Sequence, residues 1–315
     1  MSAKASALRV AVLSGGISAE RDISLQSGDA VVRALTAFGH AVTEMDPRAT
    51  DCNAVDWSAF DVAFIALHGT FGEDGGVQRI LEAAGVPFTG SASGASRLAF
   101  SKSAAKERWR QFDVRTPVAV LVNANDSAAR NAHRAAAVGY PIVVKPDAQG
   151  SSLGVSIVNS PAELHTALAA CFEYGDFGLL ERLVAGNEWT VALIDEQVLP
   201  PLCITSTGTF FDYRAKYEDD ATRHDFVGGA SPAVRDLIGA TAQSACRALG
   251  TRGAVRVDLI ADDCDRPWVL EANTVPGLSG HSLLPKAARQ AGLTFAALCE
   301  RLVRGALRTV KRRAA

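Results

Sequence analysis

Residues 254–273 read AVRVDLIADDCDRPWVLEAN, two strand-like runs on either side of a polar turn. Because the connection is short, the two strands are expected to be antiparallel neighbours. Side chains alternate along a strand, so Arg256 and Asp258 share one face, as do Glu271 and Asn273. Two carboxylates and an amide oxygen on a rigid sheet suit Mg²⁺. The stretch predicts a magnesium site, with a solvent-facing polar stripe as the alternative interpretation.

A second pattern is KPDAQGSSLG at residues 145–154, in which a glycine-flanked Ser151–Ser152 pair follows a lysine that ends an apolar run. Such a loop exposes backbone N–H groups to phosphate oxygens, and Lys145 adds a positive charge. It is not a Walker A loop, because the lysine comes before the glycines. The pattern predicts a phosphate site; a tight hairpin with a surface lysine is the alternative.

Two carboxylates, Glu181 and Glu188, lie seven residues apart at the end of a predicted strand, Leu179–Val184, and in the loop that follows it. They could bind an adenine amino group and ribose hydroxyls, although spacing alone favours solvated carboxylates. The pair Gly15-Gly16 hints at a dinucleotide fold, but the complete G-x-G-x-x-G pattern is absent.

The first third of the chain alternates strand and helix signals. Strands are predicted at Leu8–Leu13, Ala41–Met45, Val62–Leu67 and Val86–Thr89, and helices at Ser24–Phe38 and Gly76–Ala84. This βαβ rhythm predicts an open parallel sheet, whose ligands bind beyond the carboxyl ends of the strands. Glu20 and His68 both follow such ends.

The rest of the chain is predicted to form two α+β units. The first holds helices Lys102–Gln111 and Ala128–Val138 and strands Ile142–Lys145 and Val155–Val158; the second is mainly strands, at Trp189–Ile194, Gln197–Ile204, Ala254–Ala261 and Trp268–Ala272, followed by two helices. The polar segment 205–229 has no clear period, and loops of this length are usually functional or disordered. We expect domains at 1–97, 98–180 and 181–315, with 205–229 as a lid.

Composition favours a globular cytoplasmic protein. The chain has 315 residues, 48% apolar content and a formal charge of −2, so no basic field for nucleic acid is expected. Its six cysteines form no C-x-x-C pair, which is typical of reduced thiols in the cytosol. No signal peptide and no stretch long enough to span a membrane is found.

Several ordered motifs together resemble the D-alanine–D-alanine ligases of the ATP-grasp superfamily. They are VAVLSGGISAERDISLQSG, ALHGTFGEDGGVQ, VVKPDAQGSSLGVS, GTFFDYRAKY, RVDLI and LEANTVPGLSGHSLLPKAA, and they extend over nearly the whole chain. The resemblance implies an ATP-grasp fold, in which an N-terminal parallel α/β domain precedes central and C-terminal α+β domains that enclose ATP. It also implies that two D-alanines are joined through a D-alanyl phosphate, for peptidoglycan precursor synthesis, by an enzyme that is commonly a homodimer.

The resemblance assigns the ATP and metal ligands residue by residue. ATP would be held by Lys102, Lys145, Ser151, Glu181, Arg182, Leu183, Glu188 and Lys216. Two Mg²⁺ ions, for which Mn²⁺ can substitute, would be bound by Asp258, Glu271 and Asn273.

The resemblance likewise assigns the amino-acid site. Glu20 would bind the ammonium of the first D-alanine, His68 would lie near its carboxylate, and Ser282 would take the carboxylate of the second. Arg256 and the backbone of Gly277 would stabilise the oxyanion. Tyr217 would bond with Ser151 and Glu20 and so close the lid over the site.

Three positions depart from the family pattern: Arg182 stands for a common lysine, Leu278-Ser279-Gly280 for Met-Thr-Ser, and Asp225–Gly229 lacks an aromatic-x-x-Pro segment. The last departure bears on lid closure and the choice of second substrate, and leaves open a sister ligase with another second amino acid or a role in secondary metabolism. A nucleotide-binding sensor without catalysis is a further alternative, although Arg256 and the metal carboxylates are retained. An NAD-dependent oxidoreductase rests only on Gly15-Gly16.

Overall fold

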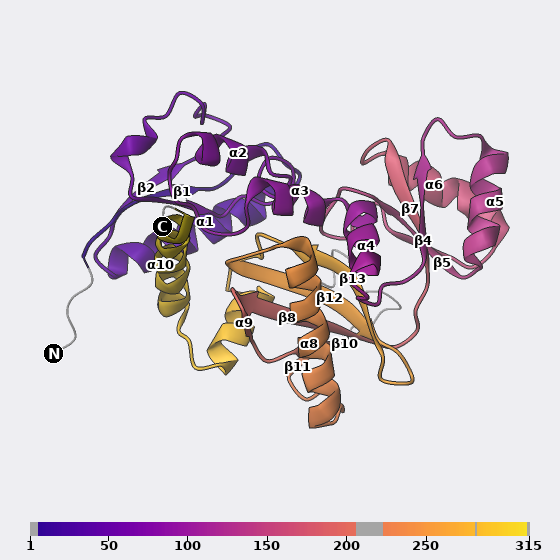
Figure 1. Cartoon of the computed structure of the whole chain (residues 1–315). Coiled ribbons are helices and arrows are strands. Elements are labelled where there is room, and N and C mark those ends of the chain that lie inside the picture. Colours follow the sequence, from indigo (N-terminus) through magenta and orange to yellow (C-terminus); the bar gives the residue numbers. More distant parts are fainter. Residues whose placement is uncertain (1–5, 206–222, 281, 314–315) are drawn as a thin grey trace.

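The computed structural model describes residues 6–205, 223–280 and 282–313, which contain three sheets (Figure 1). The first sheet has strands β1 (Arg9–Leu13), β2 (Ala41–Met45) and β3 (Val62–Ile65) in the order β2-β1-β3, all parallel as predicted. Helices α1 (Arg21–Ala37) and α2 (Gly76–Ala83) follow strands of this sheet. Alternate residues of β1 enter two separate hydrophobic cores, Val10 and Val12 one and Ala11 and Leu13 the other, which explains its continuous apolar run.

The prediction of a strand at Val86–Thr89 is wrong. The structure has only one parallel bridge there, between Ala63 and Phe88. Pro87 has no N–H to continue the ladder. Two residues after Ala63, the N–H of Ile65 donates to Thr89 Oγ1 at 3.0 Å instead of to a backbone carbonyl, so the ladder does not continue.

The second sheet is antiparallel, with strands β4 (Ala119–Asn123), β5 (Ile142–Pro146), β6 (Ser156–Val158) and β7 (Phe177–Arg182) in the order β4-β7-β5-β6. Helices α5 (Ala128–Val138) and α6 (Leu164–Phe172) supply the apolar side chains that complete its core, and a short 3₁₀ turn, η2 (Pro161–Glu163), precedes α6. Strand β4 was not predicted. Its run AVLVN is only partly buried and shows no clean alternation of apolar and polar residues.

The third sheet, also antiparallel, has the order β11-β10-β8-β12-β13, with β9 paired to β8. Its strands are β8 (Asn187–Ile194), β9 (Gln197–Val198), β10 (Leu202–Thr205), β11 (Arg223–Asp225), β12 (Ala254–Ala261) and β13 (Pro267–Asn273). The single strand predicted at Gln197–Ile204 is divided, because Pro200 and Pro201 cannot donate to a ladder.

Within the described residues, these sheets are joined by α3 (Ser93–Phe100), α4 (Lys102–Gln111), α8 (Pro232–Leu249) and α9 (Leu283–Gln290). Neither α3 nor α8 was predicted. The signals for α8 are present, since Ser231 caps its first turn, a proline follows, and Gly250 ends it in the left-handed conformation, φ 70°. The short 3₁₀ turn η1 (Trp57–Ala59) lies between β2 and β3.

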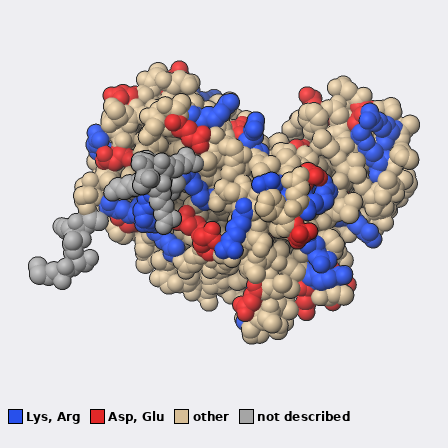
Figure 2. All heavy atoms as spheres, in the orientation of Figure 1, with Lys and Arg blue, Asp and Glu red and all other residues tan. Residues whose placement is uncertain are grey.

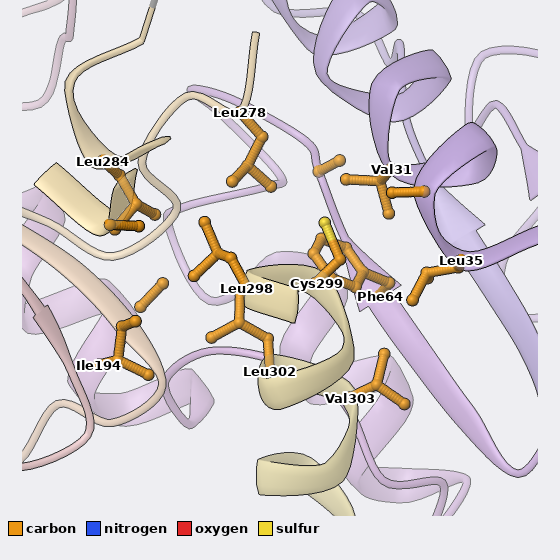
Figure 3. Close-up of a cluster of buried hydrophobic side chains, with 14 of the residues drawn as sticks. Val31, Leu35, Phe64, Ile194, Leu278, Leu284, Leu298, Cys299, Leu302 and Val303 are labelled. Atoms are coloured by element: carbon orange, nitrogen blue, oxygen red, sulfur yellow. The ribbon is translucent and has the colours of Figure 1, made fainter. Parts of the chain in front are cut away.

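The last helix, α10 (Phe295–Arg313), packs on the first sheet (Figure 1). Figure 3 shows Cys299 and Val303 of α10 on the side of Phe64 of β3 and Leu35 of α1, whereas Leu298 and Leu302 of α10 point toward Leu278, Leu284 and Ile194. The two ends of the described chain therefore share one core. No helix in the described ranges is long and apolar enough to cross a membrane. On the face seen in Figure 2, acidic and basic side chains are interspersed.

Candidate active site

Two neighbouring cavities lie between the sheets: the smaller has lining residues from all three parts of the chain, and the larger lies between the second and third sheets. The smaller, of about 90 Å³, is lined mainly by polar side chains, among them Glu20, Glu73, Ser151, Arg256, Asn273 and Ser282. The larger, of about 380 Å³, combines apolar and charged walls, among them Lys145, Ile157, Glu181, Glu188, Asp258 and Leu270. Lys102, Gln149 and Glu271 line both cavities, so a group that spans the boundary would meet these three residues.

The smaller cavity has a carboxylate, Glu20, between β1 and α1. Its Oε1 accepts a short hydrogen bond from Ser151 Oγ, a direct contact between two residues that the resemblance links only through Tyr217. Its Oε2 is buried and has no hydrogen-bond partner among the described residues. Ser151 and Ser152 have positive φ values, 53° and 57°, so the phosphate-type loop holds two serines in a conformation that L-residues rarely adopt.

Gly150 lets this loop approach the carboxylate closely. A Cβ built on Gly150 would lie 3.0 Å from Glu20 Oε2 and 3.1 Å from Oε1, so any side chain there would displace the carboxylate. Gly69, with φ +69°, does the same from the other side, since its Cβ would lie 2.9 Å from Glu20 Oε2. The motif glycines therefore leave room for the Glu20 carboxylate.

His68 is placed behind this cavity and is not among its lining residues. Its Nε2 lies 3.2 Å from Ser27 Oγ, and the imidazole is buried. Burial lowers the pKa of His68 below its ordinary value, although the charge of Glu20 opposes this, so the ring is neutral at pH 7. Through Ser27, which accepts a hydrogen bond from Leu278 N–H at 3.2 Å, it supports the loop that follows β13.

Strands β12 and β13 bring the four polar residues of the opening stretch together. Arg256 is paired with Asn273 and Asp258 with Glu271, which confirms that these strands are antiparallel neighbours. Arg256 Nη2 lies 2.9 Å from Asp258 Oδ2. The other oxygen, Asp258 Oδ1, accepts a hydrogen bond from Thr190 Oγ1 of β8 at 2.7 Å.

Lys102 connects the metal-type residues with the serine loop. Its Nζ lies 3.3 Å from Glu271 Oε2 and donates to Gln149 O at 2.6 Å. The side chain of Asn273 has turned to its own loop, where Oδ1 accepts from Val275 N–H at 2.9 Å. The ion pair with Lys102 holds Glu271 at the boundary of the two cavities, and the ion pair with Arg256 holds Asp258 in the wall of the larger one.

A buried ion triad of Glu181, Lys145 and Lys106 lies at the wall of the larger cavity, which Lys145 and Glu181 line and behind which Lys106 is buried. Glu181 Oε1 lies 2.7 Å from Lys145 Nζ, and its Oε2 lies 2.5 Å from Lys106 Nζ. Burial would raise the pKa of Glu181, but the two ammonium groups lower it below its ordinary value, so the carboxylate is ionised. Burial lowers the pKa of Lys106 to about 8. Lys106 also donates to Thr116 Oγ1 at 2.7 Å.

The loop from Gly277 to Ser282 closes the smaller cavity. A Cβ on Gly277 would lie 2.6 Å from Ser282 Oγ, so only glycine fits there without displacing the serine. Ser282 Oγ accepts from Ser279 N–H at 3.1 Å and lies 2.9 Å from Ser279 Oγ. The departure at Leu278 is a core substitution, since its side chain is 3% exposed and points into the cluster of Figure 3.

Lys216 and Tyr217 lie outside the described residues, as do 206–222 as a whole. The described ends of the expected lid pair with each other, because β10 and β11 are antiparallel with Cys203 opposite Asp225. Gly228 needs its glycine, since a Cβ would lie 2.4 Å from Cys203 Cβ.

Some residues of the site were missed by sequence reasoning. Glu73 lines the smaller cavity, Lys106 belongs to the ion triad, and Ser279 contacts Ser282. Glu73 and Ser279 lie within quoted motifs and Lys106 lies outside all of them, and none of the three has a spacing that marks it. A glutamate between glycines, in GEDGG, was the one available signal for Glu73.

Comparisons with known proteins agree with the geometry. A family model described as the D-ala D-ala ligase C-terminus matches residues 109–304, and one described as the N-terminus matches 40–91. A D-alanine–D-alanine ligase of Halorhodospira halophila is 43% identical over 300 residues, covering 95% of this chain and 96% of its own length. One of Pseudomonas entomophila is 43% identical over 289 residues, covering 91% and 89%.

A solved structure of the D-alanine–D-alanine ligase from Bacillus anthracis in complex with ATP superposes with a TM-score of 0.86 and 28% identity, covering 98% of this chain and 100% of that one. A second structure of that ligase has the same TM-score with 31% identity, covering 98% and 100%. The mixed parallel and antiparallel sheets are thus those of the ATP-grasp fold. The chain belongs to the D-alanine–D-alanine ligase family.

Proposed function

We propose that this ligase joins two D-alanines with ATP, through a D-alanyl phosphate, for peptidoglycan precursor synthesis. The observation that carries the proposal is the pair of cavities with a common boundary at Lys102, Gln149 and Glu271. A polar cavity of about 90 Å³ suits a small zwitterion, and the larger one, of about 380 Å³, suits a nucleotide. Phosphoryl transfer then takes place at the boundary.

ATP binds in the larger cavity. Lys102, Lys145 and the Ser151 loop bind its phosphates, and Arg182 and Leu183 contact adenine through their backbone. Glu188 binds the ribose. The carboxylate of Glu181 is already bonded to Lys106 and Lys145, so we assign it first to orienting Lys145 and then to the adenine amino group. Lys216 belongs to this set by the family resemblance.

Asp258, Glu271 and Asn273 fit Mg²⁺ as ligands, because all three offer hard oxygen atoms and two of them lie opposite each other in the sheet. In the described part of the chain, no three His, Cys, Asp or Glu side chains form a metal cluster, as is expected when one ligand is an amide. Bound Mg²⁺ would neutralise charge on the phosphate oxygens. Without Mg²⁺, the charge of Asp258 is balanced by Arg256 and that of Glu271 by Lys102.

The first step converts a poor electrophile into a good one. A carboxylate oxygen of the first D-alanine, whose ammonium binds Glu20, attacks the γ-phosphorus; the new O–P bond forms as the bond to the bridging oxygen of ADP breaks. The neutral His68 supports this pocket from behind. Lys102 lies where the charge of the transferred group passes from one cavity to the other.

In the second step, the deprotonated amine of the second D-alanine attacks the carbonyl carbon of the acyl phosphate. The resulting oxyanion accepts hydrogen bonds from Arg256 and Gly277 N–H, and then expels phosphate. Ser282 binds the second carboxylate. Acyl phosphates hydrolyse readily, so the lid at 205–229, with Tyr217, excludes water. We also propose the domain division 1–97, 98–180 and 181–315, a homodimer and a cytoplasmic location.

The test is to incubate the purified protein with ATP, Mg²⁺ and a panel of D- and L-amino acids, and to measure phosphate release and product masses. We expect D-alanyl-D-alanine as the dominant product and little depsipeptide when D-lactate competes. D-Serine should be rejected by no more than about 10²-fold, since an apolar pocket discriminates weakly against one added hydroxyl. A mixed dipeptide as the main product would favour the sister ligase. Nucleotide binding without turnover would indicate a sensor.

A further inference from the structure

Glu73 is a buried carboxyl in the smaller cavity with no role in the proposed mechanism. It lies in the loop between β3 and α2 and is 6% exposed. Its Oε2 accepts a hydrogen bond from Gly69 N–H at 2.9 Å, and its own N–H donates to Gly69 O at 2.8 Å. These two bonds close the loop and fix the orientation of the carboxyl group.

The other oxygen, Glu73 Oε1, is buried and has no hydrogen-bond partner among the described residues, although the residue lines the cavity. A buried polar atom without a partner is unfavourable, because it has lost its hydrogen bond to water and gained none in exchange. Such an atom in a cavity wall therefore calls for a partner that enters the cavity, either a ligand or a water molecule that a ligand can replace. Oε2 is the oxygen that holds the loop, through its hydrogen bond from Gly69 N–H, and Oε1 takes no part in that contact.

The protonation of Glu73 determines what Oε1 offers. Burial and the nearby charge of Glu20 raise the pKa of Glu73 to about 8. Glu271 of β13 acts in the same direction, whereas Arg256 of β12 and the Gly69 N–H oppose it. Two carboxyl groups in one small cavity favour a state in which one of them is neutral. Since Oε2 accepts from Gly69, the proton of a neutral Glu73 is on Oε1.

We propose that Glu73 is a substrate-binding residue whose Oε1 hydroxyl donates a hydrogen bond to the carboxylate of the first amino-acid substrate. Glu20 Oε2 is the free acceptor in the same cavity, and it takes the ammonium. The cavity thus has an acceptor for one end of a zwitterion and a neutral donor for the other. This inference rests on the proposed ligase function.

The experiment compares wild type with Glu73→Gln. Glutamine keeps the acceptor for Gly69 N–H and presents an N–H donor where the hydroxyl was, at any pH. At pH 7 we expect a KM for the first D-alanine within about threefold of wild type. At pH 9.5 the wild-type KM should be about 30-fold higher than at pH 7, because a group with a pKa near 8 is then about 3% protonated. The variant's KM should be unaffected by this ionisation.

Glu73→Gln is also its own control for the amine that titrates on the substrate, since that effect is common to both enzymes. Identical pH profiles would mean that Glu73 only closes the loop and would overturn the proposal. A wild-type KM that falls as pH rises, with weak binding by the variant, would show an anionic acceptor for ammonium and would also overturn it. Absence of dipeptide from wild type at every pH would refute the ligase function instead.

Discussion

The two cavities of the active site differ in how their charges are arranged before any ligand binds. In the larger one, Glu181 is already paired with Lys145 and Lys106. In the smaller one, an oxygen of Glu20 and an oxygen of Glu73 are buried without partners among the described residues. On the proposed assignment, internal ion pairs hold the nucleotide site in place before ATP binds, whereas the amino-acid site would be completed by its substrate.

This difference has an energetic reason. A nucleotide brings several negative charges, so its site needs cations, and a buried carboxylate keeps the two lysines charged and in place. A zwitterion brings both charges with it, so its site needs an acceptor and donors that stay unpaired. We therefore expect mutations in the larger cavity to affect stability first, and mutations in the smaller cavity to affect substrate affinity first.

The largest effect is expected for Glu181→Gln. It leaves two buried lysines without their carboxylate, and breaking a buried ion pair by removing one partner costs about 3–5 kcal/mol. Urea unfolding of the ligand-free protein should show a loss of this size. Glu107→Gln, on an exposed neighbour of Lys106 in α4, is the matched control and should cost little. Equal unfolding midpoints for the two variants would show that the triad is not a source of stability.

The next effect concerns Glu271→Gln at the boundary of the cavities. The change keeps the shape of the side chain but removes a charge beside Lys102 and from the proposed metal site. We expect turnover to fall by about 10²–10³-fold, the loss typical for one strong transition-state contact. Melting should change little. Glu196→Gln, an exposed carboxylate paired with Arg247, is the control. Near wild-type phosphate release would exclude Glu271 as a ligand.

A smaller effect, on substrate affinity and not on stability, is expected for Glu20→Gln. Its Oε1 still accepts from Ser151, so the loop contact survives. A hydrogen bond to a charged group contributes about 1.5–3 kcal/mol, so the KM for the first D-alanine should rise about 10–10²-fold. Unfolding in urea and ATP affinity should stay unchanged, as they should for the exposed control Glu44→Gln. A loss of stability comparable to that of Glu181→Gln would remove the distinction between the cavities.

The smallest effect concerns the ion pair between Arg21 and Asp46, which supports the loop that carries Glu20. Arg21 lies 2.6 Å from Asp46 and lowers the pKa of that carboxyl from 3.8 to about 2. A lowered pKa in the folded state stabilises the protein above pH 3.8, and this contribution is lost as pH falls from 3.8 toward 2. Asp46→Asn should therefore cost about 1–2 kcal/mol at pH 7 and almost nothing at pH 2. A difference between the two proteins that is independent of pH would contradict this.

The course of the chain was largely predictable where local physics is strong. The parallel strands were visible because both faces of β1 are buried, and helices α4 and α5 match their predicted bounds, Lys102–Gln111 and Ala128–Val138. The antiparallel pairing of Asp258 with Glu271 followed from a short turn and alternating polarity. Prolines explain two of the errors in strands, at Pro87 and at Pro200–Pro201, because a missing N–H ends a ladder.

By itself the sequence determined the family, the order of the motifs and the residue types that the chemistry needs, since these depend on local patterns. Only the tertiary structure decided how residues far apart in sequence combine their charges. Lys106 meets Glu181, Ser151 meets Glu20, and the Gly69 bond leaves one oxygen of Glu73 in the cavity. Burial and contacts between segments that are distant in the sequence set these protonation states and pairings. The periodicity of a single strand or helix does not encode them.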